Sequence, residues 1–375
     1  MKAILITEDH YNALGVLRSL GENGISVIII ITSTQKTFIE HSRYVDAFFK
    51  IERSEKSIID TLKKVINDNE TYVIYPLSDF AAMVVDDNHN IFSQNVIVPH
   101  MHGNMKKYLN KDFVKKEVKK YGFFVAEGKV ININEVKDYE WDIFPAILKP
   151  VLSIEGVKQD IVIVNDIYQM QEQLEILRQK RYERVLVERF ITGLEEHMIE
   201  VMGYCPKNHE PVICSIIEKI REYPLQNGST SYAKIVHHHN GIDEKYIIKF
   251  LKNTQFFGLF DMEFKYADGK AYFIECNFRN GAPSYAAKIY GNNIPLLWLQ
   301  KAIGNVETHK VEKYEDMYFM IEQNDVINML KGYVSPIKWL IEYTRAKKIF
   351  FSIKDFKPVL FYWLNMIKQR LHKKI

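Results

Sequence analysis

The first hundred residues alternate short apolar runs with stretches that favour helices, and this alternation constrains the fold more than any other feature of the chain. Between residues 3 and 31, apolar residues from Ala13 to Leu20 recur at helical spacing, and Gly21 and Gly24 provide stops. Five runs rich in β-branched and aromatic residues are expected to be strands: Ala3–Thr7, Ser26–Ile31, Ala47–Ile51, Tyr72–Tyr75 and Val96–Val98. Strands that alternate with helices form parallel sheets, so the chain is predicted to begin with a parallel α/β domain.

The first turn of this domain differs from that of a dinucleotide-binding protein. Residues 8–15 read EDHYNALG and lack the G-x-G-x-x-G pattern through which a backbone approaches a pyrophosphate. A nicotinamide cofactor is therefore not expected.

Cysteine usage and hydropathy exclude further classes of protein. The chain has an odd number of cysteines, Cys205, Cys214 and Cys276, and no two of them form a C-x-x-C pair. Neither a disulfide framework nor a structural zinc site is therefore expected. The apolar run at the start is too short for a signal peptide, and no run reaches the roughly eighteen apolar residues of a membrane span. We expect a cytoplasmic protein in a reducing compartment.

The character of the chain changes after Asn110. A Lys-rich helix over Lys111–Tyr121 is followed by short extended segments and one further helix, which is typical of a small α+β domain. Longer strands are predicted beyond it, including Phe260–Tyr266 and Ala271–Cys276, which the turn residues 267–270 (ADGK) join as a hairpin.

Two segments in the middle of the chain carry residues suited to a nucleotide. Residues 145–150 read PAILKP and place Lys149 near the end of an apolar strand, where a fixed cation suits a phosphate oxygen. Residues 185–195 read VLVERFITGLE, so a strand gives way to an acid, Glu188, a short hinge, and a second acid, Glu195.

A third segment carries oxygen ligands on the predicted hairpin. Glu263, Glu275 and Asn277 occupy odd positions of two adjacent strands, so their oxygen atoms can share one face. Mg²⁺ is usually held by one or two carboxylates together with substrate phosphates. Singly, each would more often be a solvated strand residue, and only their combination favours a metal site.

Taken in order, these segments resemble the ATP-grasp family over roughly residues 1–305. The resemblance implies a mixed α/β and α+β fold in which a nucleotide is held between two domains. We therefore predict four regions: a Rossmann-like N-terminal domain (1–105), a central small α+β lid domain (106–190), a C-terminal antiparallel-sheet catalytic domain (191–308) and a basic, aromatic helical extension (309–375).

The resemblance also implies a role for each matching residue. Glu188 would accept from the adenine amine, the hinge backbone would read the adenine edge, Glu195 would bind the ribose, and the lysines would bind phosphates. The implied ATP-binding residues are Lys111, Lys149, Glu188, Arg189, Phe190, Ile191, Glu195 and Lys234. The implied metal ligands, for Mg²⁺ or alternatively Mn²⁺, are Glu263, Glu275 and Asn277, and the implied catalytic residues are Arg279, Arg221 and Lys219.

The chain departs from the family pattern at two places. The loop after the strand lysine, residues 151–158, contains only Gly156, whereas the family's loop is usually glycine-rich. Phe278 stands where the family usually has proline.

The resemblance implies an ATP-dependent carboxylate–amine or carboxylate–thiol ligase. ATP would phosphorylate a small-molecule carboxylate, an amino acid by expectation, and an amine would attack the acyl phosphate, leaving ADP and phosphate. Residues 12–21 (NALGVLRSLG) and 41–45 (HSRYV) resemble the branch that includes bacterial D-aspartate ligase, which suggests a role in envelope or polysaccharide synthesis. The alternatives are another ATP-grasp reaction such as carboxylation, or a nucleotide-binding regulatory protein without turnover. Oligomeric state is open, with a dimer as one alternative.

The end of the chain is basic and aromatic. Residues 331–375 carry a net charge of +9 and nine aromatic residues. They are predicted either to pack as helices on the acidic body or to lie at the inner face of a membrane, with Lys and Arg against anionic lipid. Nucleic acid is not expected as a partner because no binding fold accompanies the charge. The adjacent residues His237, His238 and His239 cannot converge on one tetrahedral ion from a strand, so a solvated or substrate-facing turn is expected there.

Overall fold

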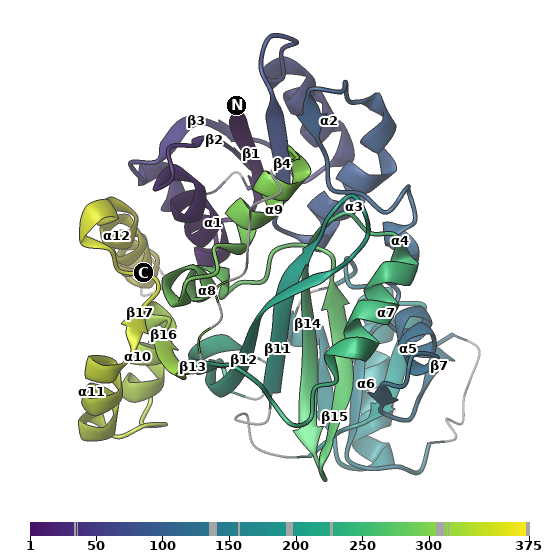
Figure 1. Ribbon diagram of the computed structural model, residues 1–375. Coiled ribbons are helices and arrows are strands. Elements are labelled where there is room, and N and C mark those ends of the chain that lie inside the picture. The colour runs from purple at the N-terminus through teal and green to yellow at the C-terminus, as the bar shows by residue number, and fades with distance from the viewer. Residues whose placement is uncertain are drawn as a thin grey trace.

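The computed structural model describes residues 1–33, 35, 37–134, 141–156, 158–192, 198–225, 228–304, 311, 313 and 315–372. Three β-sheets with flanking helices account for most of this chain (Figure 1). The mixed α/β and α+β class predicted from the sequence is confirmed.

The N-terminal sheet is parallel and has the strand order β3-β2-β1-β4-β5. Its strands coincide with the five predicted runs: β1 (Lys2–Thr7), β2 (Ser26–Ile31), β3 (Val45–Lys50), β4 (Tyr72–Pro76) and β5 (Val96–Ile97). The helices of this domain are α1 (Tyr11–Gly21), α2 (Glu55–Val65) and α3 (Asp79–Asp87). The strand order reverses between β1 and β4, and ligands of open α/β sheets bind beyond the carboxyl ends of strands at such a point.

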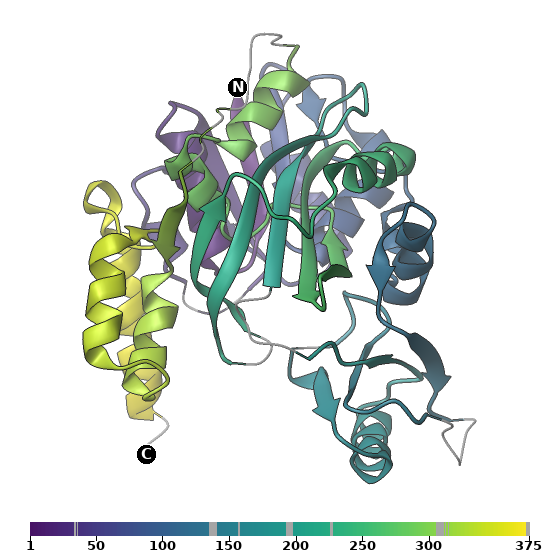
Figure 2. The ribbon, with the colours of Figure 1, turned by 60° about the horizontal axis from the view of Figure 1, so that its bottom comes forward.

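A four-stranded antiparallel sheet with the order β7-β10-β8-β9 lies within the region predicted as a lid (106–190), and this sheet with its helix is called the lid domain below. Its elements are β7 (Gly128–Asn132), β8 (Ala146–Pro150), β9 (Val162–Val164), α6 (Ile167–Gln179) and β10 (Arg184–Arg189). Leu174, Leu177 and Met170 lie on one face of α6 and pack on this sheet, which gives the lid domain a core of its own. Figure 2 shows this domain projecting away from the rest of the molecule.

The third sheet has eight strands in the order β17-β16-β13-β12-β11-β14-β15-β6 and is called the large sheet below. Its strands are β6 (Phe124–Val125), β11 (Met198–Cys205), β12 (Val212–Tyr223), β13 (Ser229–Val236), β14 (Gly258–Ala267), β15 (Lys270–Asn277), β16 (Met317–Met320) and β17 (Lys347–Lys348). The helices around it are α4 (Met105–Tyr108), α5 (Lys111–Lys119), α7 (Glu244–Thr254), α8 (Ser284–Tyr290) and α9 (Ile294–Ala302). Trp298 of α9 packs 5.3 Å from Tyr75 and 5.2 Å from Phe257 between ring centroids, so the N-terminal domain and the large sheet share one core.

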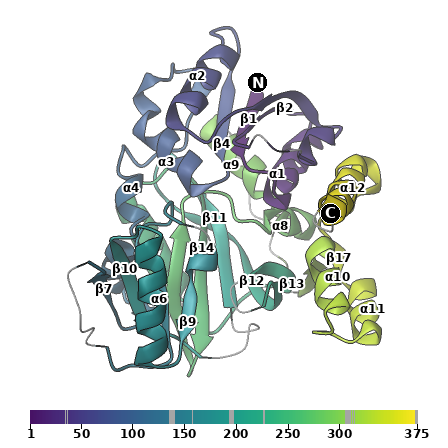
Figure 3. The same ribbon diagram turned by 180° about the vertical axis from the view of Figure 1, so that it is seen from behind.

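The C-terminal extension is both helical and part of the large sheet. It contains α10 (Glu322–Leu330), α11 (Pro336–Arg345) and α12 (Lys357–His372), but β16 also pairs with β13 and β17 pairs with β16. Arg18 of α1 binds Asp355 with an Nε–Oδ2 distance of 2.9 Å, and Tyr362 lies 5.4 Å from Phe38. Figure 1 and Figure 3 accordingly show α12 beside α1. Among the described residues, no helix has the length and apolar character needed to cross a bilayer.

Candidate active site

Two lysines and one glutamate are buried together between the lid sheet and α5. Glu188 of β10 forms ion pairs with Lys115 of α5 and with Lys149 of β8, and all three are less than 10% exposed. Leu186, two residues before Glu188, stands opposite Lys149 across the two strands, and this register brings the side chains together. We call Lys115, Lys149 and Glu188 the lid cluster.

Two lysines share the one carboxylate of the lid cluster. Burial opposes ionisation of Glu188, but Lys149 and Lys115 outweigh it and hold the pKa of Glu188 below its ordinary value. Burial and the repulsion of Lys149 lower the pKa of Lys115 to about 7 despite its contact with Glu188. The lid cluster therefore has a surplus of positive charge when both lysines are protonated.

The large sheet presents a row of carboxylates on one face. Glu200 of β11 stands opposite Glu263 of β14, and Glu263 stands opposite Glu275 of β15. Asp261 is two residues from Glu263 and stands opposite Asn277, so it lies on the same face. We call Glu200, Asp261, Glu263 and Glu275 the sheet cluster.

The sheet cluster is crowded with negative charge. Burial, together with Glu200 and Glu263, raises the pKa of Asp261 well above its ordinary value, and Asp261 Oδ1 has no hydrogen-bond partner among the described residues. Lys219 of β12 lies 3.7 Å from Glu200 between Nζ and Oε1. Burial works against its charge, but Glu263, Glu200 and Glu222 raise the pKa of Lys219 above its ordinary value. One buried lysine thus faces several carboxylates, an arrangement that suits a further cation.

The lid and sheet clusters influence each other through Glu275. Burial opposes ionisation of this carboxylate, but Lys111 at the start of α5, Arg279 and the more distant Lys149 hold its pKa below the ordinary value. Lys111 is itself buried, and burial lowers its pKa while Glu275 works in the opposite direction. Lys111 of α5 and Lys149 of the lid domain therefore act on the same carboxylate of the large sheet.

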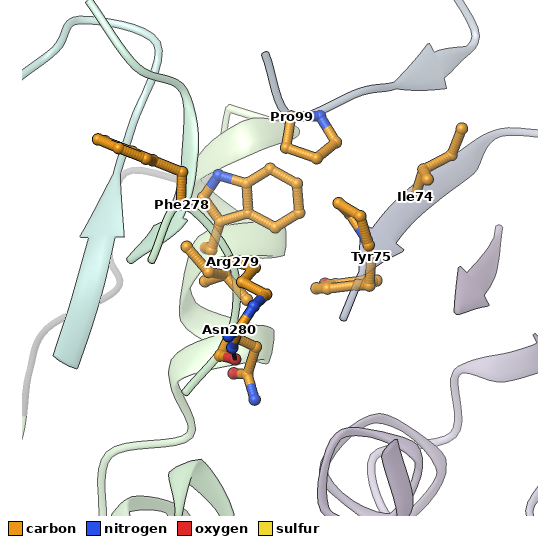
Figure 4. Close-up of a pocket in the computed structure, with 9 residues that line it drawn as sticks. Ile74, Tyr75, Pro99, Phe278, Arg279 and Asn280 are labelled. Carbon is orange, nitrogen blue, oxygen red and sulfur yellow. Dashed lines mark hydrogen bonds between the residues drawn. The ribbon is translucent and has the colours of Figure 1, made fainter. Parts of the chain in front are cut away.

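Arg279 is fixed by a chain of hydrogen bonds that crosses between domains. Its Nε lies 2.6 Å from Oδ1 of Asp79 at the start of α3, and its Nη2 donates to Asn277 Oδ1 at 3.0 Å. Asn277 donates in turn to Glu275 at 3.3 Å. Arg279 also lines a small pocket with Tyr75 of the N-terminal domain, as Figure 4 shows. The N-terminal domain thereby sets the position of the predicted transfer arginine.

The first turn of the N-terminal domain also reaches this site. The Tyr11 hydroxyl has no hydrogen-bond partner among the described residues, and its pKa is raised well above the ordinary value by burial and then by Glu200, Asp261 and Glu263. The phenol of Tyr11 therefore lies close to the sheet cluster. The side-chain amide of its neighbour Asn12 donates to the backbone carbonyl of Asn280 and accepts from the Asn280 side chain, which holds the turn against the segment that follows Arg279.

No protein-family model matches the chain. A D-alanine-D-alanine ligase from Aquifex aeolicus is 32% identical over 186 residues, which cover 45% of this chain. The chain spans 58% of the length of that curated relative.

Solved structures match over most of the chain. The L-amino acid ligase from Bacillus licheniformis superposes with a TM-score of 0.62 at 14% identity, covering 86% of this chain and 80% of its own. The N5-carboxyaminoimidazole synthetase from Staphylococcus aureus gives 0.64 at 14% identity over 88% and 85%. A biotin carboxylase from Campylobacter jejuni, solved as a complex with β,γ-ATP, gives 0.64 at 18% identity over 84% and 74%. The chain has the ATP-grasp fold.

Several predicted residues of the ATP-grasp site meet at the junction of the lid domain and the large sheet. These are Lys111, Lys149, Glu188, Lys219, Glu263, Glu275, Asn277 and Arg279. The hinge residues Arg189, Phe190 and Ile191 directly follow Glu188, and the N–H groups of Arg189 and Phe190 donate to Glu127 and Pro145. Glu195 lies outside the described residues.

Arg221 does not join this group, which corrects its predicted place at the ATP-grasp site. Its guanidinium binds Asp325 of α10 with two hydrogen bonds of 3.0 and 2.9 Å and Glu342 of α11 at 2.7 Å. Lys219 stands opposite Ala233 and Arg221 opposite Tyr232, so a β-bulge turns the two side chains to opposite faces. Arg221 therefore anchors the C-terminal extension.

Lys234 is likewise placed away from the sheet cluster. It pairs with Glu218 at 2.8 Å and with Asp316 at 3.6 Å, and burial is outweighed by Glu218 so that its pKa is raised. This pairing with the neighbouring strand gives no support to its predicted contact with nucleotide.

The structure adds to this group five residues that the sequence reasoning did not single out: Tyr11, Asp79, Lys115, Glu200 and Asp261. Lys115 stands one helical turn after Lys111, and Asp261 stands two strand residues before Glu263, so local spacing could have indicated both. Glu200 and Asp79 had no such signal, because their partners are more than 60 residues away in sequence.

Proposed function

We propose that the chain is an ATP-dependent ligase that joins a small-molecule carboxylate to an amine through an acyl phosphate. One observation carries this proposal: a buried surplus of lysine charge on the lid side faces a buried surplus of carboxylate charge on the large sheet. A polyphosphate needs cations, and the metal ion that accompanies it needs oxygen ligands. The two clusters offer these groups on opposite sides of one junction.

The chain's own residues would position the reactants and stabilise the negative charge of the phosphates. Lys111 and Lys149 are point charges for phosphate oxygens, and Arg279, fixed by Asp79, is directed at the charge that builds up during transfer. The Tyr11 hydroxyl, close to the sheet cluster, is available as a donor to the substrate carboxylate or its acyl phosphate. Such positioning and charge stabilisation account for most of the rate in phosphoryl transfer.

The donor set fits Mg²⁺. Glu263, Glu275 and Asn277 would hold the ion, and their carboxylate and amide oxygens are ligands that it prefers. When bound, the ion neutralises phosphate charge and acts as a Lewis acid. Mn²⁺ accepts similar oxygen ligands and is proposed as a substitute.

ADP release measured with a panel of L- and D-amino acids tests this function. We expect release to depend on a particular acid and amine together, with an amide in the product by mass spectrometry. Bicarbonate with an amine forms a second arm, because the fold also resembles carboxylases. ADP release in this second arm, without a carboxylic acid substrate, would favour carboxylation. Nucleotide binding without ADP release under every condition would favour a regulatory protein. The relationship to a D-alanine-D-alanine ligase favours amino acids, D-aspartate included, and hence an envelope or polysaccharide precursor as product.

We also propose that the C-terminal extension contacts anionic lipid. One side of the extension packs on the body, since Phe361 and Tyr362 join the N-terminal core. Other large apolar side chains of the extension are exposed: Leu330, Ile337, Leu340, Ile341, Phe351, Ile353, Phe356, Leu360, Leu364 and Ile367. Apolar side chains among lysines, within a segment of net charge +9, are typical of a surface that binds a negatively charged bilayer.

Vesicle binding by point variants tests this contact better than truncation, because truncation near Gly332 would remove β17 and the Glu342 partner of Arg221. Ile337 and Ile353 are 77% and 83% exposed. We expect wild-type protein to sediment with phosphatidylglycerol vesicles at low salt, and Ile337→Ser with Ile353→Ser to weaken this binding. Tyr168→Ser, at a lid residue 79% exposed, is the matched control. Equal binding by both variants, or no binding by the wild type, would contradict the lipid contact.

A further inference from the structure

Three histidines of the N-terminal domain meet away from the ATP-grasp site. His89 lies in a short 3-10 helix after α3 (His89–Ile91), and His100 and His102 lie in the segment that leads to α4. One ring nitrogen from each lies within 4.8 Å of those of the other two. The rings of His100 and His102 are 4.5 Å apart between centroids, and those of His89 and His100 are 5.0 Å apart.

Hydrogen bonding leaves one ring nitrogen of His89 and one of His100 available to bind a ligand. Nδ1 of His89 lies 2.7 Å from the carbonyl oxygen of Asp86. A carbonyl only accepts, so Nδ1 carries the proton and Nε2 keeps its lone pair, which is how metal-binding histidines are usually oriented. Nδ1 of His100 is buried and has no hydrogen-bond partner among the described residues. A buried nitrogen without a partner is costly unless something binds it.

The side chain of Asp86 holds the histidine segment in place. This carboxylate is fully buried and accepts from the backbone N–H groups of Met101, Gly103 at 3.1 Å and Met105 at 2.8 Å. His102 between them has a φ of 53°, a left-handed conformation that costs energy for a histidine. The carboxylate thus fixes a strained turn that brings His102 back toward His100.

We propose that His89, His100 and His102 bind a divalent transition metal ion, with Zn²⁺ as the ion that this ligand set fits best. Neutral imidazole suits zinc, and three protein ligands with water in the fourth position form a known tetrahedral arrangement. Nitrogens bound to one zinc ion at about 2.1 Å lie roughly 3.4 Å apart, so nitrogens now within 4.8 Å of one another need to approach by up to about 1.4 Å. His102 is exposed and can rotate toward the other two.

The surroundings of His100 support this site. The backbone of His100 exchanges two hydrogen bonds of 2.9 Å with Phe257, immediately before β14. An ion bound here would tie the end of α3 to the segment that joins the N-terminal domain to the large sheet. The inference is independent of the proposed ligase activity, because none of these residues belongs to the lid or sheet cluster.

Zinc content of the full chain, purified without a histidine tag, tests the site. After treatment with EDTA, incubation with ZnCl₂ and gel filtration, we expect one zinc ion per chain by mass spectrometry of the metal. The double variant His89→Gln with His102→Asn should retain none, since asparagine tolerates the left-handed backbone at residue 102. The control is His237→Gln with His238→Gln, which changes two exposed histidines elsewhere and should leave the content unchanged.

A second measurement guards against misfolding of the double variant. ZnCl₂ at about a hundredfold excess over its dissociation constant should raise the wild-type melting temperature by roughly 3–5 °C, whereas the single variant His102→Asn should show no such shift. Circular dichroism should show that each variant is folded. Absence of zinc from the wild type, full zinc content in the double variant, or loss of zinc from the control would each overturn the proposal.

Discussion

The lid cluster and the sheet cluster both bury charge at the same junction, but they balance it in different ways. In the lid cluster, Glu188 is ion-paired with two lysines, so its carboxylate is neutralised and one lysine charge is left in surplus. In the sheet cluster, carboxylates outnumber the cations Lys219 and Arg279. Burial and the neighbouring carboxylates therefore raise the pKa of Asp261. A self-paired cluster can form before any ligand binds, whereas a cluster of like charges is costly until a cation arrives. The difference indicates that the lid side is prepared for an anion and the sheet side for a metal ion.

The largest effect should come from removing a carboxylate charge from the sheet cluster. Glu275→Gln should lower kcat by at least about 10³-fold, because a neutral amide cannot replace the charge that holds the metal ion against phosphates. ADP release at saturating ATP and Mg²⁺ is the measurement. Glu218→Gln is the control, since Glu218 is a half-buried glutamate paired with Lys234 outside the cluster. Wild-type turnover by Glu275→Gln would refute the metal assignment.

Removing a lysine of the lid cluster should act on nucleotide binding. Lys149→Met should weaken ATP binding by about 10-fold to 100-fold, the usual value of one charge-assisted contact. Isothermal titration with a non-hydrolysable ATP analogue measures this effect. Lys234→Met is the matched control and should bind nucleotide normally, because Lys234 pairs with Glu218 away from the cluster. An equal loss of ATP affinity in Lys149→Met and Lys234→Met would contradict the assignment of nucleotide binding to the lid cluster.

A change outside both clusters should affect stability and leave nucleotide binding intact. Arg221→Gln removes the buried partner of Asp325 and Glu342, and we expect a loss of about 3 kcal/mol in the free energy of unfolding. Denaturant unfolding measures the loss, and titration with nucleotide should show wild-type affinity in native buffer. A large fall in ATP affinity with unchanged stability would instead return Arg221 to the active site.

The smallest effect concerns a proton in the lid cluster. The pKa of Lys115 is about 7 in the free protein, and phosphate charge nearby should raise it. ATP binding at pH 8 should therefore take up part of a proton, and affinity should fall as pH rises from 7 to 9. Calorimetry in two buffers of different ionisation enthalpy measures the uptake, and Lys115→Met should abolish it. Proton release in the wild type would contradict the lowered pKa.

Sequence reasoning succeeded where the deciding signal was local. The five N-terminal strands follow from β-branched runs between turns, and β8 lies within residues 145–150, where an apolar strand with Lys149 near its end was predicted. Glu275 and Asn277 were placed on one face because a strand repeats every two residues, whatever it packs against. The ATP-grasp resemblance depends on the order of such local segments, so it too could be read from the chain.

Only the tertiary structure decided which of these residues meet. Two register shifts in β12, on either side of Arg221, accompany the turn of Lys219 toward Glu200 and of Arg221 toward α10, and alternation along the strand did not predict them. Asp79 reaches Arg279 across 200 residues of sequence. The pairing of a buried charge depends on what long-range packing brings near it, and removal from water makes that pairing decide the charge state. Sequence spacing therefore identified the chemical groups, while the packing of three sheets determined how they are assembled.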